Sequence, residues 1–308
     1  MTPSVWAVVL NWNGLEHTLA CLESLEQLSY PHSRLHVVVV DNGSKVSPRA
    51  VVEKSYPQVE VIETAKNLGY SGGNNFGIDR ALAAGADYVW ILNNDTTLDA
   101  AALGQLVATA QSHPRAAAVG GKVFLADPAD TLWVTWGRVT WMQSLISLVG
   151  AGRPDGPAYD GQRQVPWIPG CSIMMRAEAL RDLGGFDDEF FAYHEDVEWA
   201  ARARHKGWEL WYTGSARIYH SVHASSGGRT SYQGFRKYLS ARNSILYARR
   251  HGRPWQWLLM GASILLTLPF QYLRRLATGE QGGVVMKVRG WTDALRGRPI
   301  PFEELGLR

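Results

Sequence analysis

Three carboxylates lie within four residues, at Glu195, Asp196 and Glu198, directly after the aromatic segment Phe190–Tyr193. If this stretch is helical, Glu198 and Arg202 form an anchoring pair on the same face as Glu195. Asp196 then points roughly 100° away from Glu195 and can face a cavity. Aromatic neighbours lower the local polarity and raise the proton affinity of a carboxylate, which suits a general base. The alternative is an acidic helix N-terminus that the helix dipole favours.

Polar residues also follow the apolar runs in the first hundred residues. Four runs predict buried parallel strands separated by helical segments: Val5–Leu10, Leu35–Val40, Val59–Ile62 and Tyr88–Leu92. In an open parallel sheet, ligands bind at the carboxyl ends of the strands, so the polar residues beyond them should converge on one crevice. These residues are Asn11, Asp41, Asn67 and Asp95. Any one of them can instead be a turn former or a helix cap.

The glycine-rich segment Ser71–Gly77 is expected to be a loop that leads into a helix over Ile78–Ala84. Its glycines would allow the backbone to approach a phosphate or a sugar closely, next to a helix N-terminus. The segment lacks the dinucleotide-binding fingerprint and the lysine of a P-loop. The alternative is a helix cap with flexible turns.

Further along the chain, the apolar patterns predict more helices and strands of an α/β protein. The expected helices are His17–Leu28, Asp99–Ser112 and Ala177–Leu183, and the expected strands are Ala116–Phe124, Ile173–Met175 and Trp208–Tyr212. Residues 125–165 are rich in Gly, Pro and Trp, and they predict a loop-like excursion near the active site. Four tryptophans could shape an acceptor groove, although core packing is the more common fate of each one taken singly: Trp133, Trp136, Trp141 and Trp167.

Composition limits the class of protein. A chain of 308 residues with 46% hydrophobic residues can form one large α/β domain or two smaller ones, each with a hydrophobic core. The two cysteines fit no disulfide or metal framework, and the amino terminus does not resemble a signal peptide, so we expect a cytoplasmic protein.

The net charge of +3 is unevenly distributed, because residues 229–308 hold 14 Lys and Arg against 4 Asp and Glu. This basic tail predicts an anionic partner, either a membrane or a nucleic acid.

Six segments, in this order, resemble family 2 inverting glycosyltransferases of the GT-A fold, especially the rhamnosyltransferase-like branch. They are Val8–Gly14, Val39–Ser44, Lys66–Ile78, Leu92–Thr96, Gly184–Arg202 and Ile218–His220, within roughly residues 5–225. The resemblance implies a Rossmann-like, mostly parallel central sheet flanked by helices, with a helical, basic C-terminal extension. We therefore expect a catalytic, nucleotide-sugar-binding domain over residues 1–228 and a membrane-associated or dimerising region over 229–308.

The resemblance also implies residue roles. Asp196 would be the catalytic base, with Glu195 beside it. Asn11 and Asp41 would hold the nucleotide base and ribose. The remaining nucleotide-sugar contacts would come from Asn13, Lys66, Asn67, Gly69, Gly73, Asn75, Asn93, Asn94 and Trp167.

Asn93-Asn94-Asp95 occupies the position of the metal-binding motif that is usually written Asp-x-Asp, and Asn93 replaces its first Asp. Asp95 would be the main carboxylate on a divalent cation, Mn²⁺ or Mg²⁺, which neutralises the leaving diphosphate. His220 is the candidate second ligand, His223 is the alternative, and a His ligand favours Mn²⁺. Either histidine can instead be a buried residue bonded to the backbone.

The C-terminal region begins with a predicted helix over Tyr232–His251, followed by the apolar segment Trp255–Phe270. This segment is shorter than the roughly 20 residues needed to span a bilayer, and it contains Pro269. Its Trp residues and flanking Arg residues predict an interfacial or shallow re-entrant helix on an anionic membrane. A packing helix or a homodimer helix is the alternative.

The family resemblance, together with these patterns, implies a metal-dependent inverting glycosyltransferase at the cytoplasmic face of the cell membrane. It would move a sugar from a nucleotide-diphosphate donor, dTDP-rhamnose or a UDP-sugar, to a polysaccharide or polyprenyl-linked acceptor. The alternatives are a metal-dependent nucleotide-diphosphate hydrolase or phosphotransferase and a catalytically silent nucleotide-sugar-binding scaffold. Binding of the basic tail to nucleic acid is a further alternative that we do not expect.

Overall fold

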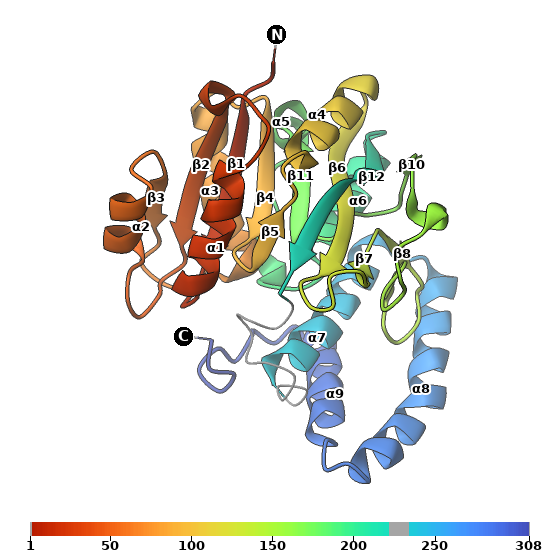
Figure 1. The fold of residues 1–308 in the computed structure, drawn as a ribbon. Helices are drawn as coiled ribbons and strands as arrows, with labels where there is room; N and C mark the ends of the chain where they lie inside the picture. Colours follow the sequence, from red (N-terminus) through yellow and green to blue (C-terminus); the bar gives the residue numbers. More distant parts are fainter. Residues whose placement is uncertain (1, 222–233, 308) are drawn as a thin grey trace.

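The computed structural model describes residues 2–221 and 234–307 (Figure 1). Within these residues, ten strands form one sheet, whose central path runs β10-β12-β6-β11-β4-β1-β2-β3, while β5 pairs with β12 and β7 with β6. The strands of the first half are β1 Val5–Asn11, β2 Leu35–Asp41, β3 Glu60–Glu63, β4 Tyr88–Asn93 and β5 Thr96–Leu98. Those of the second half are β6 Ala116–Leu125, β7 Leu132–Val134, β10 Gln162–Gln164, β11 Ser172–Arg176 and β12 Glu209–His220.

The first four strands pair in parallel, β1 with β2 and β4, and β2 with β3. The central strands β1 and β4 are apolar runs buried on both faces, as parallel strands between helices usually are, whereas the edge strand β3 is only partly buried. In β1, Val5, Ala7 and Val9 face one layer of the core, whereas Trp6 and Val8 face the other. All four strands form within two residues of the predicted boundaries. The predicted α/β class is therefore confirmed.

Helices cover both faces of the sheet (Figure 1). Core residues of α1 (Leu15–Glu26), α2 (Arg49–Ser55) and α4 (Ala102–Ser112) pack in one layer. Core residues of α3 (Gly69–Ala83), α5 (Ala177–Leu183) and α6 (Glu195–His205) pack in the other. This α/β/α arrangement leaves the carboxyl ends of the parallel strands open for a ligand.

The glycine-rich segment differs from the prediction. Ser71–Gly77 is not a loop, because it lies inside α3. A Cβ at Gly77 would lie 2.3 Å from Val8 Cγ1, and one at Gly73 would lie 2.5 Å from Leu10 Cδ1. These two glycines therefore let α3 pack tightly on β1. The prediction that the segment is a loop is wrong, whereas its approach to a phosphate or sugar stays a prediction.

The second half of the sheet is mixed. β11 runs antiparallel between β4 and β6, and β12 pairs in parallel with β6. β12 is one strand of 12 residues rather than the short strand predicted at Trp208–Tyr212, and it carries His220 at its end. The excursion over residues 125–165 holds short strands, including β8 (Gly137–Val139) and β9 (Ile146–Leu148), so it is more regular than predicted.

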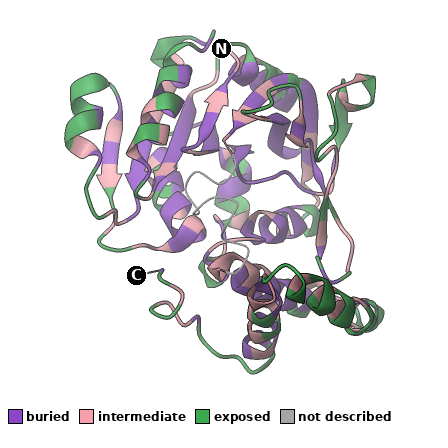
Figure 2. Cartoon of the chain, turned by 60° about the horizontal axis from the view of Figure 1, so that its bottom comes forward, coloured by how far each residue is buried: buried purple, intermediate pink, exposed green. Residues whose placement is uncertain are grey.

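Three helices follow the sheet: α7 (Phe235–His251), α8 (Pro254–Leu276) and α9 (Gly282–Leu295). α7 packs beside α9, and α8 extends away from the sheet with a largely exposed surface (Figure 2). Pro269 lies inside α8. None of the described helices is both long and apolar enough to cross a bilayer. The predicted domain boundary at residues 228–229 lies outside the described residues.

Candidate active site

The carboxyl ends of β1, β2 and β4 meet at one edge of the sheet. The strand register aligns Asn11 with Asp41 and Leu10 with Asn93. β1 lies between β2 and β4, so the strand order reverses at β1. In open α/β sheets, ligands bind in the crevice beside such a reversal. The topology therefore places the ligand crevice at the polar segments that follow β1, β2 and β4.

Asn11 and Asp41 are joined at the base of this crevice. The Asn11 amide donates hydrogen bonds to Asp41 Oδ1 (3.0 Å) and to Ser44 Oγ (3.1 Å). Asn11 Oδ1 accepts one from Thr18 Oγ1 (2.9 Å). Asn11 and Asp41 are both buried. Their role in binding a nucleotide base and ribose stays a prediction.

A cavity of about 150 Å³, which we call the strand-end cavity, opens beside this pair. Its lining includes the predicted residues Asn67, Gly69, Asn93 and Asn94, together with Trp12, Asn42 and Tyr70. Sequence reasoning assigned no role to these last three residues. Trp12 and Asn42 each directly follow a predicted strand-end residue, and that position is the signal that could have identified them.

Asn42 organises one wall of the strand-end cavity. Its amide donates hydrogen bonds to Asn67 Oδ1 (3.1 Å) and to the Gly69 carbonyl (2.9 Å). Asn67 donates in turn to the carbonyl of Leu307 (3.2 Å), near the C-terminus. The wall therefore joins three segments that are distant in sequence.

Asp95 and His220 form the candidate metal pair. His220 Nε2 lies 2.9 Å from Asp95 Oδ1, and both side chains are buried. This distance is that of a direct hydrogen bond between the two side chains. It is also close to the roughly 3 Å that separates two adjacent ligands of a cation with metal–ligand distances of about 2.1 Å, so the pair is compatible with a shared cation. His220 Nδ1 is buried and has no hydrogen-bond partner among the described residues.

Within the described residues, no group of three or more His, Cys, Asp and Glu side chains could hold a metal ion. Asp95 and His220 would therefore need further ligands from a diphosphate or from water. Asn93 Nδ2 lies 3.4 Å from His220 Nε2, beside the pair. The alternative ligand His223 lies outside the described residues.

Asp196 lies at the start of α6, and backbone groups hold its carboxylate. Asp196 Oδ2 accepts a hydrogen bond from the Gly170 backbone N–H (2.8 Å), and Oδ1 accepts one from the Val197 N–H (2.8 Å). Burial raises the pKa of Asp196 to about 6, and these N–H groups oppose the rise. A carboxylate with this pKa is ionised at neutral pH and can still accept a proton, as a general base must.

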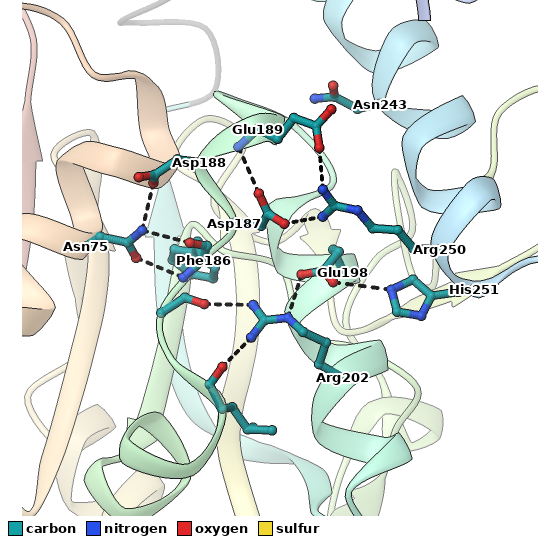
Figure 3. Close-up of polar contacts among 12 residues, drawn as sticks. Asn75, Phe186, Asp187, Asp188, Glu189, Glu198, Arg202, Asn243, Arg250 and His251 are labelled. Atoms are coloured by element: carbon teal, nitrogen blue, oxygen red, sulfur yellow. Dashed lines mark hydrogen bonds and ion pairs between the residues drawn. The ribbon is translucent and has the colours of Figure 1, made fainter. Parts of the chain in front are cut away.

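The anchoring face of α6 agrees with the sequence analysis. Arg202 Nε donates to Glu198 Oε2 at 2.8 Å, and His251 Nε2 lies 3.3 Å from Glu198 Oε1 (Figure 3). Glu195 is buried, and its Oε2 has no hydrogen-bond partner among the described residues. Burial, followed by the negative charge of Asp196, raises the pKa of Glu195 well above its usual value.

Asp196 and the Asp95–His220 pair line the same cavity, of about 340 Å³, which we call the carboxylate cavity. Cys171 also lines it, and the pKa of its thiol is raised by burial and then by the charges of Asp95 and Asp196. The candidate base and the candidate metal pair therefore face a single space from different elements.

Aromatic and apolar side chains form much of the remaining wall of the carboxylate cavity. Trp133 and Trp167 line it, and Trp133 packs edge-on against His220 with ring centroids 4.7 Å apart. Trp136 is buried in the main core and Trp141 packs against Tyr247, so these two do not form the groove that was predicted.

Six predicted nucleotide-sugar residues do not line either cavity. Two of them, Asn11 and Asp41, directly precede the lining residues Trp12 and Asn42 of the strand-end cavity. Asn13 and Lys66 are exposed, and Asn13 Oδ1 accepts a hydrogen bond from the Lys45 backbone. Gly73 packs against β1. Asn75 exchanges hydrogen bonds with the Phe186 backbone (Figure 3). In the described structure, these residues either bond and pack against neighbouring segments or lie on the surface, and they do not line a cavity.

The sequence also matches a known protein family. The sequence model of the family described as "Glycosyltransferase like family 2" matches residues 3–243. The chain belongs to glycosyltransferase family 2. Its enzyme class is therefore that of a glycosyltransferase.

Two curated relatives from Mycobacterium tuberculosis are similar to this glycosyltransferase. An N-acetylglucosaminyl-diphospho-decaprenol L-rhamnosyltransferase is 30% identical over 259 residues, which cover 74% of this chain and 81% of the relative. Galactofuranosyltransferase GlfT1 is 29% identical over 213 residues, which cover 67% of this chain and 66% of the relative.

Among solved structures, a mannosyltransferase from Pyrobaculum calidifontis in complex with GDP-Man and Mn²⁺ has a TM-score of 0.60 at 17% identity. The match covers 96% of this chain and 88% of that structure. This similarity confirms the GT-A fold that the sequence motifs implied.

Proposed function

We propose that this glycosyltransferase is a metal-dependent, inverting enzyme that moves rhamnose from dTDP-rhamnose, or another sugar from a UDP-sugar, to a polyprenyl-diphosphate-linked acceptor. The observation that supports it most is the shared carboxylate cavity, which Asp196 and the Asp95–His220 pair line together. The M. tuberculosis rhamnosyltransferase, whose name specifies an acceptor of this chemistry, supports the choice of donor sugar and acceptor.

In the proposed reaction, Asp196 takes the proton of the acceptor hydroxyl as the hydroxyl oxygen forms a bond to the anomeric carbon. The bond from that carbon to the diphosphate oxygen breaks on the opposite face, and its electron pair leaves with the nucleoside diphosphate. Attack and departure on opposite faces invert the configuration of the sugar. Asp95 and His220 would hold a divalent cation, which would neutralise the charge on the leaving diphosphate.

The donor would occupy the strand-end cavity with its nucleotide and reach the carboxylate cavity with its sugar. The two cavities share Tyr70, Asn93, Ala192 and Tyr193, so they are adjacent. Trp133 and Trp167 offer the apolar surface on which a sugar ring packs. Arg236 of α7 also lines the carboxylate cavity and supplies a positive charge to an anionic substrate.

The proposal extends to the surface that the enzyme works on, the cytoplasmic face of the cell membrane. The outer side of α8 exposes a row of apolar residues at helical spacing, among them Leu258, Leu265, Leu266 and Phe270. Arg253 precedes the helix, and Arg274 and Arg275 lie in its last turn. An apolar helix face with basic flanks fits the interface of an anionic bilayer, where a polyprenyl-linked acceptor resides.

A transfer assay tests the proposed reaction. The purified enzyme is incubated with dTDP-rhamnose or a panel of UDP-sugars and with polyprenyl-diphospho-N-acetylglucosamine, in Mn²⁺ or in EDTA. We expect a lipid-linked disaccharide by mass spectrometry in Mn²⁺ only, with the anomeric configuration inverted by NMR. Release of free sugar without any disaccharide would instead indicate a hydrolase.

A further inference from the structure

The segment that leads into α6 adopts an unusual backbone conformation. Phe191, Tyr193 and His194 have positive φ angles of 58°, 72° and 69°. Residues with a Cβ rarely adopt such angles, and they persist only where the surrounding structure fixes them. We call Glu189–His194 the base-presenting loop, because Glu195 and Asp196 follow it directly.

One side chain outside the loop bonds three of its six backbone carbonyl groups. The Asn243 amide of α7 donates hydrogen bonds to the carbonyl oxygens of Phe190 (2.7 Å), Ala192 (2.8 Å) and Tyr193 (2.7 Å). Asn243 is completely buried. Its two N–H groups thus serve three carbonyl groups that the irregular loop cannot place in a helix or a sheet.

Neighbouring residues of α7 reinforce this attachment. Arg242 Nη1 donates to the Glu189 carbonyl (2.9 Å) and to Asn243 Oδ1 (3.0 Å), which fixes the orientation of the amide. Arg250 pairs with the carboxylate of Glu189, the first residue of the loop, and with that of Asp187, two residues earlier (Figure 3). The ion pairs are partly exposed, whereas the Asn243 contacts are buried and therefore cost more to break.

The loop leads directly into the helix that carries Asp196. Asp196 is the second residue of α6, directly after the loop, and its Oδ2 accepts a hydrogen bond from the Gly170 N–H at 2.8 Å. We propose that Asn243 is a positioning residue, which holds the base-presenting loop so that Asp196 faces the sugar in the carboxylate cavity. This inference rests on the proposed role of Asp196 as the general base.

Ser244 is a matched control on the same helix. It is as buried as Asn243, but its Oγ donates to the Ala241 carbonyl and accepts from Trp291 Nε1 of α9. Ser244→Ala therefore perturbs the packing of α7 without removing any bond to the loop.

A double-mutant cycle tests the inference. We expect Asn243→Ala to lower kcat by roughly 10²-fold, which is the effect of misplacing a catalytic group by about 1 Å. The control Ser244→Ala should change kcat by less than about threefold. In an Asp196→Asn background, Asn243→Ala should add little further loss, because the group it positions is already disabled. An equal loss in both backgrounds, or an unchanged kcat in Asn243→Ala alone, would overturn the inference. Full activity of Asp196→Asn alone would instead remove the general base of the proposed function.

Amide hydrogen exchange gives a second measurement that needs no substrate. Asn243→Ala should speed exchange in residues 187–197 while the sheet keeps its protection, whereas Ser244→Ala should leave this segment unchanged. Asn243→Ser, which retains one donor, should show an intermediate effect on both exchange and kcat, and it replaces Asn243→Ala if that variant does not fold. Unchanged exchange in 187–197 for both Asn243 variants would contradict the proposed attachment.

Discussion

Asp196 is subject to two opposing effects, and their balance suits its proposed role. Burial favours the neutral acid, while the N–H groups of Gly170 and Val197 favour the carboxylate. The result is a pKa of about 6, two units above that of an ordinary Asp. The aromatic segment before Asp196 made a raised proton affinity predictable from sequence, but the opposing donor from Gly170 was not.

The pH dependence of transfer follows from this pKa. A base must be ionised, so kcat/KM, which reports the pKa of the free enzyme, should be constant above about pH 7 and fall tenfold per pH unit well below pH 6, where Asp196 is protonated. Asp196→Asn should lower kcat by about 10²- to 10⁴-fold and abolish this acidic limb. Initial rates between pH 5 and 8 measure both effects.

Asp182→Asn is the control for this series, because Asp182 of α5 is an exposed carboxylate that pairs with Lys206, at the opposite end of α6 from Asp196. It should keep the wild-type profile. An acidic limb that survives in Asp196→Asn would assign the titration to another group.

At the scale of elements, α8 presents apolar side chains that the described residues leave uncovered. Leu265 and Leu266 are 76% and 80% exposed. On the inner side of the helix, Ser263 accepts a hydrogen bond from the Gln143 backbone, which anchors α8 to the excursion. The exposed side is thus held outward by the fold.

The membrane proposal predicts that Leu265→Gln with Leu266→Gln weakens binding to anionic vesicles at least tenfold, because two buried leucines contribute about 3 kcal/mol or more. Co-sedimentation with phosphatidylglycerol-containing vesicles measures the change. Val46→Gln, at an equally exposed valine far from α8, is the control and should bind as the wild type does. If the wild type ignores vesicles but forms a dimer that the double variant cannot form, the exposed side of α8 is a subunit interface instead.

The elements differ in how well the sequence predicts them, for physical reasons. The strands β1, β2 and β4 are continuous apolar runs, and their burial on both faces leaves few alternatives. The segment Ser71–Gly77 misled prediction because glycine disfavours helices in isolation. Here the missing Cβ atoms allow close packing of α3 on β1, a contact between segments that are about 65 residues apart.

At the scale of the whole molecule, the site joins the sheet to the C-terminal helices. Arg236 and Ser240 of α7 line the carboxylate cavity, and Phe235 lines the strand-end cavity. The basic region that composition set apart from the catalytic part is therefore also part of the site. A ligand that fills the two cavities would bind both parts and stabilise the whole fold.

Thermal unfolding should reveal this linkage. A nucleoside diphosphate at 100 times its Kd should add about 2.7 kcal/mol of stability and raise Tm by several degrees, with a further rise in Mn²⁺. Asp95→Asn should remove the Mn²⁺-dependent rise and keep the rise due to nucleotide alone. EDTA should reverse only the Mn²⁺-dependent part in the wild type. An Mn²⁺-dependent rise of wild-type size in Asp95→Asn would place the cation elsewhere.

The residues of the candidate site that belong to local sequence motifs could be predicted. The residues that support them through long-range contacts could not. Asp95, Asp196 and His220 stand in recognisable segments, and the structure places all three at one cavity. The support of Asp196 by Gly170, and of its loop by Asn243, joins segments that no local pattern connects. Asn75 shows the opposite error, because a polar residue in a family motif bonds to the Phe186 backbone rather than lining a cavity.

The position of Leu307 has a practical consequence for handling the enzyme. Leu307 is buried, lines the strand-end cavity and accepts a hydrogen bond from Asn67. An affinity tag or reporter fused after this residue would begin beside the strand-end cavity, where we propose that the nucleotide binds, and would interfere with donor binding. Strand β1 runs toward the site, so residues before Val5 lie at the opposite edge of the sheet, which makes the amino terminus the better attachment point (Figure 1).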